Sequence, residues 1–312
     1  MTNDLMKNQQ TTSTILMIRP VNFGFNEQTA GSNAFQNRNA EQQQVQDKAL
    51  SEFDEMVNVL RDNGVEVIVI EDTPEPHTPD SIFPNNWVSF HSDGNVFLYP
   101  MMAENRRLER REDIITDLEN EFEIKHVIDL SRFEHEHKFL EGTGSMVLDR
   151  ENKIAYACLS PRTDKEVLEL YCHESGYRPV LFHAVDQIGM DIYHTNVLMC
   201  VGSSFVVICL ESIKDSAEKA MVIETIAATK KELIDISFDQ MNHFAGNMLE
   251  VQSGRGESLI VMSKSAWDSL NEHQRAKLSY FSKPVYSDIN TIETNGGGSA
   301  RCMMAEVHLP RV

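Results

Sequence analysis

Cys302 is the strongest candidate nucleophile in the sequence. It follows Asn295-Gly-Gly-Gly-Ser-Ala-Arg301, whose three consecutive glycines permit unusual backbone angles and let main-chain amides approach a ligand closely. We expect an accessible thiol beside a basic residue to have a lowered pKa, and the thiolate is the reactive form. The alternative is a buried, inert cysteine behind a flexible turn. A phosphate-binding loop is disfavoured because no Gly-Lys-Ser/Thr completes that motif.

A cysteine nucleophile needs a proton shuttle, and His194 is the best candidate among the eleven histidines. It lies two residues before Asn196, so in a strand both side chains would face the same side. The run that contains His135 and His137 is charged and predicts a solvated loop, with an interrupted metal site as the alternative. Four others flank predicted helices or strands and are expected at the surface or in packing: His91, His126, His173 and His183.

Glu141 is a candidate carboxylate partner. Glutamate is a poor strand former, yet this one lies between Leu140 and Gly142 at the start of an apolar stretch, which indicates a specific role. That role would be to orient a substrate N–H or to hold His194 in its charged form. The alternative is a structural salt bridge.

The bulk composition excludes several classes of protein. The chain is 41% hydrophobic and 24% charged, and no apolar run approaches the roughly 18 residues of a membrane span. A formal net charge of −20 disfavours nucleic acid as a partner. Residues 1–14 are polar and lack the features of a secretion signal, which predicts a disordered leader on a cytoplasmic protein.

The five cysteines include no Cys-x-x-Cys pair, so neither a disulfide framework nor a zinc site is indicated. Four of them lie in apolar segments and are expected to be buried thiols: Cys158, Cys172, Cys200 and Cys209.

A repeat of helix, strand, loop and strand runs along the chain. The predicted helices are Ala49–Asn63, Glu104–Phe122, Thr163–Ser175, Ile213–Lys231 and Ser265–Tyr280. The strands expected after them are Val65–Ile70, Ile124–Ile128, Pro179–Phe182, Leu233–Ile236 and Pro284–Tyr286. A polar or small residue then opens a further apolar stretch in each unit. These openers are Asn86, Glu141, Asn196, Asn247 and Cys302, separated by 55, 55, 51 and 55 residues.

Strand partners follow the first four openers, at Val96–Pro100, Ile154–Leu159, Phe205–Leu210 and Leu259–Ser263. The N-terminal segment Ile15–Ile18 could supply the missing fifth partner and close a ring. Five quasi-equivalent units around an axis would then bring the five openers together at the centre. The alternative, that an opener only begins a core strand, stays open for Asn247.

Three motifs together resemble those of the guanidine-modifying enzymes: Glu141-Gly, His194-x-Asn196 and Gly296-Gly-Gly-Ser-Ala-Arg-Cys302. This group contains arginine deiminases, dimethylarginine hydrolases, succinylarginine dihydrolases and amidinotransferases. The chain is most similar to the citrulline-utilisation hydrolase branch, from Met17 to Leu309. The resemblance implies a pentein fold, an α/β propeller of five ββαβ-like blades with pseudo-fivefold symmetry, as one catalytic domain over residues 15–312.

The resemblance also implies residue roles: Cys302 as nucleophile, His194 as general acid and base, and Glu141 as carboxylate partner. Ser160-Pro-Arg162-Thr163 resembles the family's Ser-x-Arg-Thr element, whose arginine contacts the substrate's α-carboxylate. A salt bridge at a helix start is the alternative for Arg162. The implied reaction uses a covalent cysteine intermediate and needs no metal or organic cofactor.

Two departures bear on the substrate. Arginine deiminases carry aspartates where this chain has Asn86 and Asn196, and an amide donates and accepts without charge. This favours a neutral ureido group, as in citrulline, over a guanidinium, although Asp80 could restore one negative charge and keeps arginine-like substrates open. Asn247 is a further candidate contact. The expected partner is a small ureido or guanidino molecule, bound by a monomer or a homodimer. An amidinotransferase and a non-catalytic pentein binding protein are the competing functions.

Overall fold

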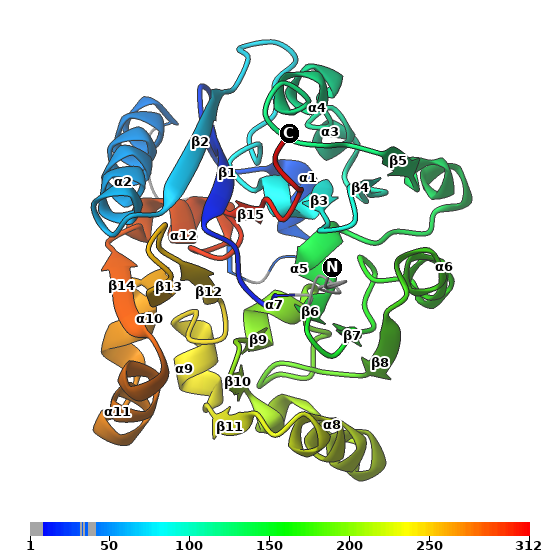
Figure 1. Cartoon of the computed structure of the whole chain (residues 1–312), viewed down its shortest axis with the longest axis vertical. Helices are drawn as coiled ribbons and strands as arrows, with labels where there is room; N and C mark the ends of the chain where they lie inside the picture. The colour runs from blue at the N-terminus through cyan, green and yellow to red at the C-terminus, as the bar shows by residue number, and fades with distance from the viewer. Residues whose placement is uncertain (1–8, 32, 34, 37–41) are drawn as a thin grey trace, which may run out of the picture.

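Small sheets surround a central axis, and the longer helices lie on the outside of the ring (Figure 1). The computed structural model describes residues 9–31, 33, 35–36 and 42–312. Over these residues there are five sheets of three strands each. The five-bladed α/β propeller predicted from the sequence is therefore confirmed.

Each blade has the same topology: an antiparallel strand pair, then a third strand that runs parallel to the middle one. A helix connects the middle strand to the third, which is the usual way to link parallel neighbours. The blades, in strand order, are β15 (Ala305–Glu306), β1 (Thr14–Arg19) and β2 (Glu66–Glu71); β3 (Val88–Phe90), β4 (Asn95–Leu98) and β5 (His126–Asp129); β6 (Val147–Asp149), β7 (Ile154–Cys158) and β8 (Arg178–Phe182); β9 (Met199–Val201), β10 (Phe205–Ile208) and β11 (Glu232–Asp235); and β12 (Leu249–Gln252), β13 (Ser258–Ser263) and β14 (Lys283–Ser287).

The crossover helices are α2 (Gln42–Asp62), α3 (Glu104–Arg107), α4 (Glu112–Leu118), α6 (Lys165–Ser175), α8 (Ser216–Ala228), α10 (Lys264–Ser269) and α11 (Glu272–Phe281). Four of these outer helices, α6, α8, α10 and α11, begin at a residue whose side chain caps the helix. Asp164 caps the helix of the third blade, and Gly176, at φ +73°, ends it. Shorter elements lie between the blades: α1 (Glu27–Ala30), η1 (Pro84–Asn86), η2 (Ser131–Glu136), α5 (Gly142–Ser145), α7 (Thr195–Leu198), η3 (Leu210–Ser212), α9 (Phe238–Asn242) and α12 (Asn290–Gly296).

The two ends of the chain close the ring. Strand β15 pairs antiparallel with β1, with Ile15 opposite Glu306 and Leu16 opposite Ala305. The N-terminal segment thus supplies the strand that the C-terminal unit lacks, as the repeat predicts.

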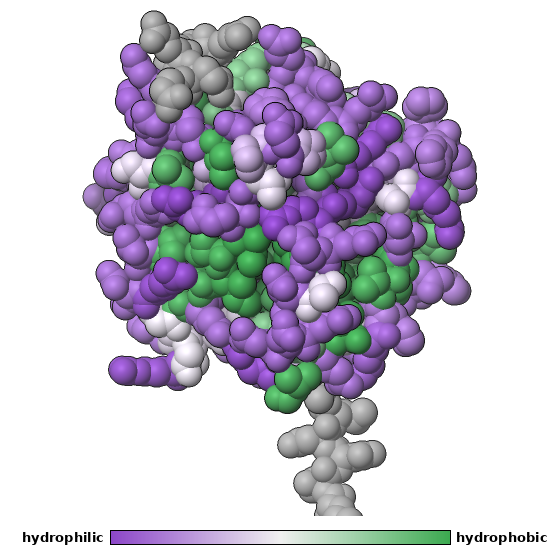
Figure 2. All heavy atoms as spheres, turned by 90° about the horizontal axis from the view of Figure 1, so that it is seen from above, coloured by the Kyte–Doolittle hydropathy of each residue, from purple (hydrophilic) through white to green (hydrophobic). Residues whose placement is uncertain are grey.

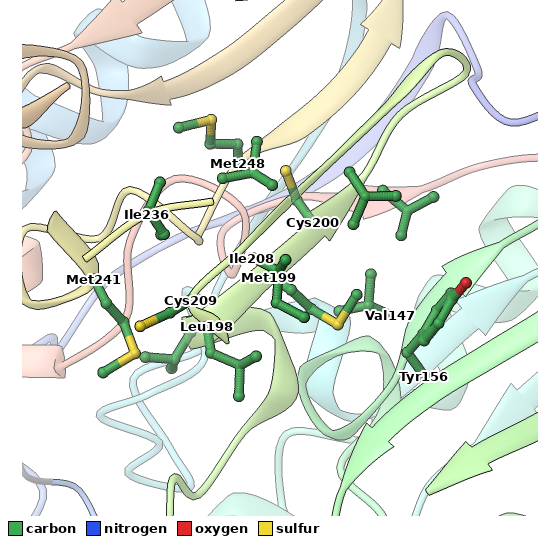
Figure 3. Close-up of a cluster of buried hydrophobic side chains, with 14 of the residues drawn as sticks. Val147, Tyr156, Leu198, Met199, Cys200, Ile208, Cys209, Ile236, Met241 and Met248 are labelled. Carbon is green, nitrogen blue, oxygen red and sulfur yellow. The ribbon is translucent and has the colours of Figure 1, made fainter. Parts of the chain in front are cut away.

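The core consists of apolar side chains that pack between neighbouring blades. Figure 3 shows part of the largest cluster, where Val147, Met199, Ile208 and Met248 from successive blades come together. The four cysteines expected in apolar segments are all buried. Burial raises the pKa of each of these thiols to about 12, so they are inert at neutral pH.

The face shown in Figure 2 is mostly hydrophilic, with apolar patches between the hydrophilic side chains. Over the part of the chain that the structure describes, no helix combines the length and apolar character needed to cross a bilayer.

Three sequence-based expectations need correction. The helix predicted over Glu104–Phe122 is two helices, α3 and α4, and the one over Ser265–Tyr280 is α10 and α11. The second break follows from a capping box, in which the side chains of Asn271 and Gln274 bond reciprocally to backbone amides and start a new helix. The openers also lie before the strands, not in them: Asn86 and Asn196 are in short helical turns, Glu141 is the N-cap of one, and Asn247 and Cys302 are in irregular or turn segments.

The disordered leader predicted over residues 1–14 is wrong for its last part, while residues 1–8 lie outside the described residues. Gln10 is only 6% exposed. Its side-chain amide donates to the carbonyls of Leu148 (2.9 Å) and Val201 (3.1 Å) and accepts from the amide of Arg150 (2.8 Å). This stretch therefore ties two blades together.

Candidate active site

A cavity of about 20 Å³ lies among the turns that precede the strands. Its lining residues are Asn33, Asp80, Phe83, Asn86, Arg106, Arg162, Tyr193, His194, Gly296, Gly297, Gly298 and Cys302. Five of the eight residues predicted for the site are among them. The other three contact this group: Glu141 bonds to His194, and Asn196 and Asn247 bond to Cys302. All eight predicted residues are thus brought to one place.

Cys302 is held in a turn whose first residue is Ser299, with its amide bonded to the Ser299 carbonyl at 2.9 Å. The side-chain amides of Asn196 and Asn247 point at its Sγ, with nitrogen–sulfur distances of 3.4 and 3.3 Å. These N–H groups stabilise negative charge on the sulfur. The asparagines, which the sequence alone assigned to the substrate, therefore also contact the nucleophile.

Two expectations about Cys302 are wrong. The residue is 4% exposed, not accessible. The neighbouring basic residue faces elsewhere, because the guanidinium of Arg301 binds Glu306 (2.7 Å) and the carbonyl of Met304 (2.9 Å). Sequence adjacency did not indicate this, since successive side chains in a turn point in different directions.

His194 precedes α7, and its ring is buried. Its Nε2 lies 2.8 Å from Oε2 of Glu141, and since a carboxylate accepts, we assign the proton to Nε2 and leave Nδ1 as the base. Burial lowers the pKa of His194 to about 4, against the raising effect of Glu141. The resting ring is therefore neutral at pH 7, contrary to the expectation that Glu141 holds it charged. The carboxylate instead orients the ring and would stabilise an imidazolium formed during reaction.

Gly144 makes this arrangement sterically feasible. A Cβ at this position would lie 2.8 Å from Nδ1 of His194 and 2.4 Å from Nδ2 of Asn86. The second glycine of the Glu141-Gly-Thr-Gly segment is thus needed for the histidine and the asparagine to approach the backbone.

Glu141 is completely buried and remains ionised. Its Oε1 accepts from the amide of Met102 at 3.0 Å, and its Oε2 lies 3.5 Å from Arg162 and 3.9 Å from Arg106. Burial raises the pKa of the carboxyl, but Arg162, His194 and Arg106 together outweigh it and hold the pKa well below its ordinary value.

Arg162 lies just before helix α6, and its side chain also lines the cavity. Its guanidinium lies 4.9 Å from the centre of the Tyr193 ring and donates to the carbonyl of Thr29 at 3.2 Å. The cap of the following helix is Asp164, so Arg162 is not a helix-start salt bridge. Its ion pair with Glu141 connects it to the histidine.

Arg106 is a site residue that sequence reasoning missed. It is buried, pairs with both oxygens of Glu109 at 2.9 Å, and donates to Oδ1 of Asn86 at 2.9 Å. The only local signal was the Arg106–Glu109 spacing of three residues, which is common on solvated helices. Burial raises the pKa of Glu109 to about 8, with Arg106 opposing this.

Three buried polar atoms at the cavity have no hydrogen-bond partner among the described residues: Oδ1 of Asp80, Nδ2 of Asn86 and Oδ1 of Asn196. Unpaired buried polar groups are costly and rare unless a ligand satisfies them. Burial also raises the pKa of Asp80, partly offset by Arg106. The cavity lining therefore presents one acceptor, on Asp80, and one donor, on Asn86, and Asn196 beside Cys302 adds a second acceptor.

The described residues contain no group of three His, Cys, Asp or Glu side chains arranged to hold a metal ion. His135 and His137 are exposed at η2, in the solvated loop expected from the sequence.

A ring of five blades with Cys302, His194 and Glu141 at its centre defines the pentein class of guanidine-modifying enzymes. The family profile described as N,N dimethylarginine dimethylhydrolase, eukaryotic, matches residues 19–309, and the chain belongs to this family. A comparison with curated protein sequences finds no significant match.

Solved structures share the fold at low sequence identity. The N-terminal domain of ArgZ, an arginine dihydrolase from the ornithine-ammonia cycle in cyanobacteria, has a TM-score of 0.74 and 17% identity over 95% of this chain and 98% of that domain. Unliganded AgrE has a TM-score of 0.72 and 19% identity over 95% of this chain. The dimethylarginine hydrolase of Pseudomonas aeruginosa has a TM-score of 0.66 and 14% identity over 95% of this chain and 99% of that one. The chain spans only 39% of full-length ArgZ and of AgrE.

Proposed function

We propose that the chain is a cysteine-dependent hydrolase that cleaves a C–N bond in the ureido or guanidino group of an arginine-derived amino acid, with citrulline as the preferred substrate. Cys302 is the nucleophile, His194 the proton shuttle and Glu141 its carboxylate partner. Related structures support this: the ArgZ domain has been solved with substrate, with product and covalently bound to a reaction intermediate, and the Pseudomonas enzyme with citrulline.

The set of unpaired atoms carries the proposal. A ureido group has one carbonyl acceptor and N–H donors, so its oxygen can accept from Nδ2 of Asn86 while its NH₂ donates to Oδ1 of Asp80 or Asn196. A guanidinium offers donors only and would leave the Asn86 amide facing another N–H. One buried mismatch of this kind costs about 1–3 kcal/mol, enough to favour the ureido compound.

The other end of the substrate has a cationic environment. Arg162 lines the cavity, and a guanidinium fork binds a carboxylate well. Since Glu141 already pairs with Nη1 of Arg162, the substrate carboxylate would bind another edge of this guanidinium group.

The reaction balances without a cofactor. Neutral His194 accepts the proton of the Cys302 thiol, and the resulting thiolate adds to the ureido carbon. The terminal nitrogen takes this proton back from the His194 imidazolium and leaves as ammonia, which gives a carbamoyl-type thioester of Cys302. His194 then accepts a proton from water, which attacks the same carbon and breaks the C–S bond; the proton returns to the sulfur, and the product carbamate decomposes to ornithine and carbon dioxide.

Product analysis tests this proposal. The purified chain is incubated with citrulline, arginine, agmatine and N-acylarginines, and ammonia and ornithine are measured, with the Cys302→Ser variant as control. We expect ornithine and ammonia from citrulline, and none with the variant. A large preference for arginine would contradict the reading of the asparagines. A requirement for added glycine as acceptor would indicate a transferase instead.

A further inference from the structure

A second cavity, of about 520 Å³, lies outside the Cys302 site. It is formed by the segment after β8, the end of α9 and the helix α12 that leads to the glycine-rich turn. Its volume lies within the ordinary range of small-molecule sites. The proposed reaction uses none of its lining residues.

The chemistry of its lining is acidic and aromatic. Asp186 and Glu293 contribute carboxyl groups, and the rings of Phe35 and Phe244 lie 5.1 Å apart at an angle of 41°. No lysine or arginine is among the described residues that line it. Carboxylates beside aromatic faces suit an organic cation, which gains both ion-pair and cation–π energy.

Glu293 is a buried carboxyl in this lining that no cationic side chain neutralises among the described residues. The residue is 5% exposed, and its Oε1 accepts from the hydroxyl of Ser299 at 2.6 Å. Burial, together with the nearby carboxyl groups of Glu52 and Asp288, raises its pKa to about 7. A cation that entered the cavity beside Glu293 would favour the charged form of this carboxyl.

We propose that this cavity is a second binding site, separate from the Cys302 pocket, for a small organic cation with an ammonium or guanidinium group on a short aliphatic chain. The cationic group pairs with Glu293 and Asp186, and the aliphatic part contacts Phe35 and Phe244. The site lies next to the reacting turn, since Ser299 bonds to Glu293 by its hydroxyl and to Cys302 by its carbonyl.

Calorimetric titration of the full chain with agmatine tests this proposal. We expect the variants Asp186→Asn and Glu293→Gln each to weaken agmatine binding at least tenfold. Both keep an oxygen acceptor: Asn at 186 can still accept from the amides of Ile188 and Met190, and Gln at 293 from Ser299. Glu224→Gln, on the exposed face of α8, is the matched control and should bind agmatine as the parent chain does.

The catalytic pocket provides the opposite control. Asn86→Asp adds a negative charge there and should leave the agmatine Kd within twofold. If Asn86→Asp strengthens binding while Asp186→Asn has no effect, agmatine occupies the Cys302 pocket and the proposal is overturned. Binding by Asp186→Asn and Glu293→Gln at parental affinity overturns it too. All titrations are made in the Cys302→Ser background, so no turnover contributes heat and the result is independent of the proposed reaction.

Discussion

At the scale of single residues, asparagine amides contact the nucleophile where the sequence suggested a basic side chain. Asn196 donates to the sulfur of Cys302, and its own Oδ1 has no hydrogen-bond partner among the described residues. If this oxygen accepts from the substrate as proposed, the charge of residue 196 should affect both thiolate reactivity and substrate choice.

Replacing Asn196 by Asp keeps the shape but puts a carboxylate 3.4 Å from the sulfur in place of an N–H donor. We expect iodoacetamide labelling of Cys302 at pH 7 to slow roughly tenfold or more, because a like charge disfavours the thiolate. The ratio of kcat/KM for arginine to that for citrulline should rise. Equal labelling rates in variant and parent would show that the Asn196 amide does not stabilise the sulfur.

Gly144→Ala tests how closely the backbone must approach His194. The added methyl would lie 2.8 Å from Nδ1 and 2.4 Å from the Asn86 amide, so both side chains must move. A shift of this size should lower kcat/KM by about 100-fold, with a stability loss of roughly 1–3 kcal/mol. Gly254→Ala is the control, since the nearest atom to a Cβ there is the Gly64 carbonyl oxygen at 3.6 Å, an ordinary contact. An active Gly144→Ala variant would mean that the ring tolerates displacement.

The depressed pKa of His194 predicts a direction for the pH dependence of stability. The unfolded histidine binds a proton below about 6.5, whereas the folded one does so only near 4. Its contribution to the free energy of unfolding is therefore complete above pH 6.5 and is lost as the pH falls toward 4. Urea unfolding at a series of pH values should show that, between pH 4 and 6.5, the free energy of unfolding of His194→Asn changes less steeply with pH than that of the parent chain. An unchanged slope would place the ring in a solvated environment.

At the scale of elements, the short segment before β1 joins two neighbouring blades that lie far from this segment in the sequence. Gln10 makes three buried hydrogen bonds to β6, the residue after it and β9. Gln10→Ala leaves those backbone groups unsatisfied, so we expect a loss of about 1–3 kcal/mol in the free energy of unfolding and unchanged kcat. Gln9→Ala, at an exposed position, should change neither quantity. Equal unfolding midpoints for both variants would refute the role of Gln10.

The elements also show what the sequence could predict. The spacing of the openers predicted the ring because each blade needs nearly the same chain length. His194 and Asn196 were joined by a strand argument, yet they meet at the site through the one-turn helix α7. Arg106 escaped notice because it lies in the four-residue helix α3 and contacts Asn86 and the Asp80 carbonyl, at least 20 residues earlier in the chain, which amphipathic periodicity does not encode.

At the scale of the whole molecule, the ring holds a narrow site. A cavity of about 20 Å³ accommodates about one water molecule, far less than an amino acid, so part of the wall must move for a substrate to bind. The blades are tied by a common core and by β15–β1 pairing, so we expect the segment around α1 to be the part that moves. It attaches through side chains, with Asn26 donating to Asp80 (2.7 Å) and the Thr29 carbonyl accepting from Arg162 (3.2 Å).

These attachments predict which region responds to substrate. Asp80 and Arg162 are proposed substrate contacts, so a bound ligand competes with or reinforces the bonds that hold residues 26–31. Hydrogen exchange of the Cys302→Ser variant should therefore change in the peptide covering 26–31 when citrulline is added, while β10 in the ring core should keep the same protection. Identical exchange in residues 26–31 with and without citrulline would mean that the substrate enters through another wall, and the glycine-rich turn at 296–298 would then be the segment that must open.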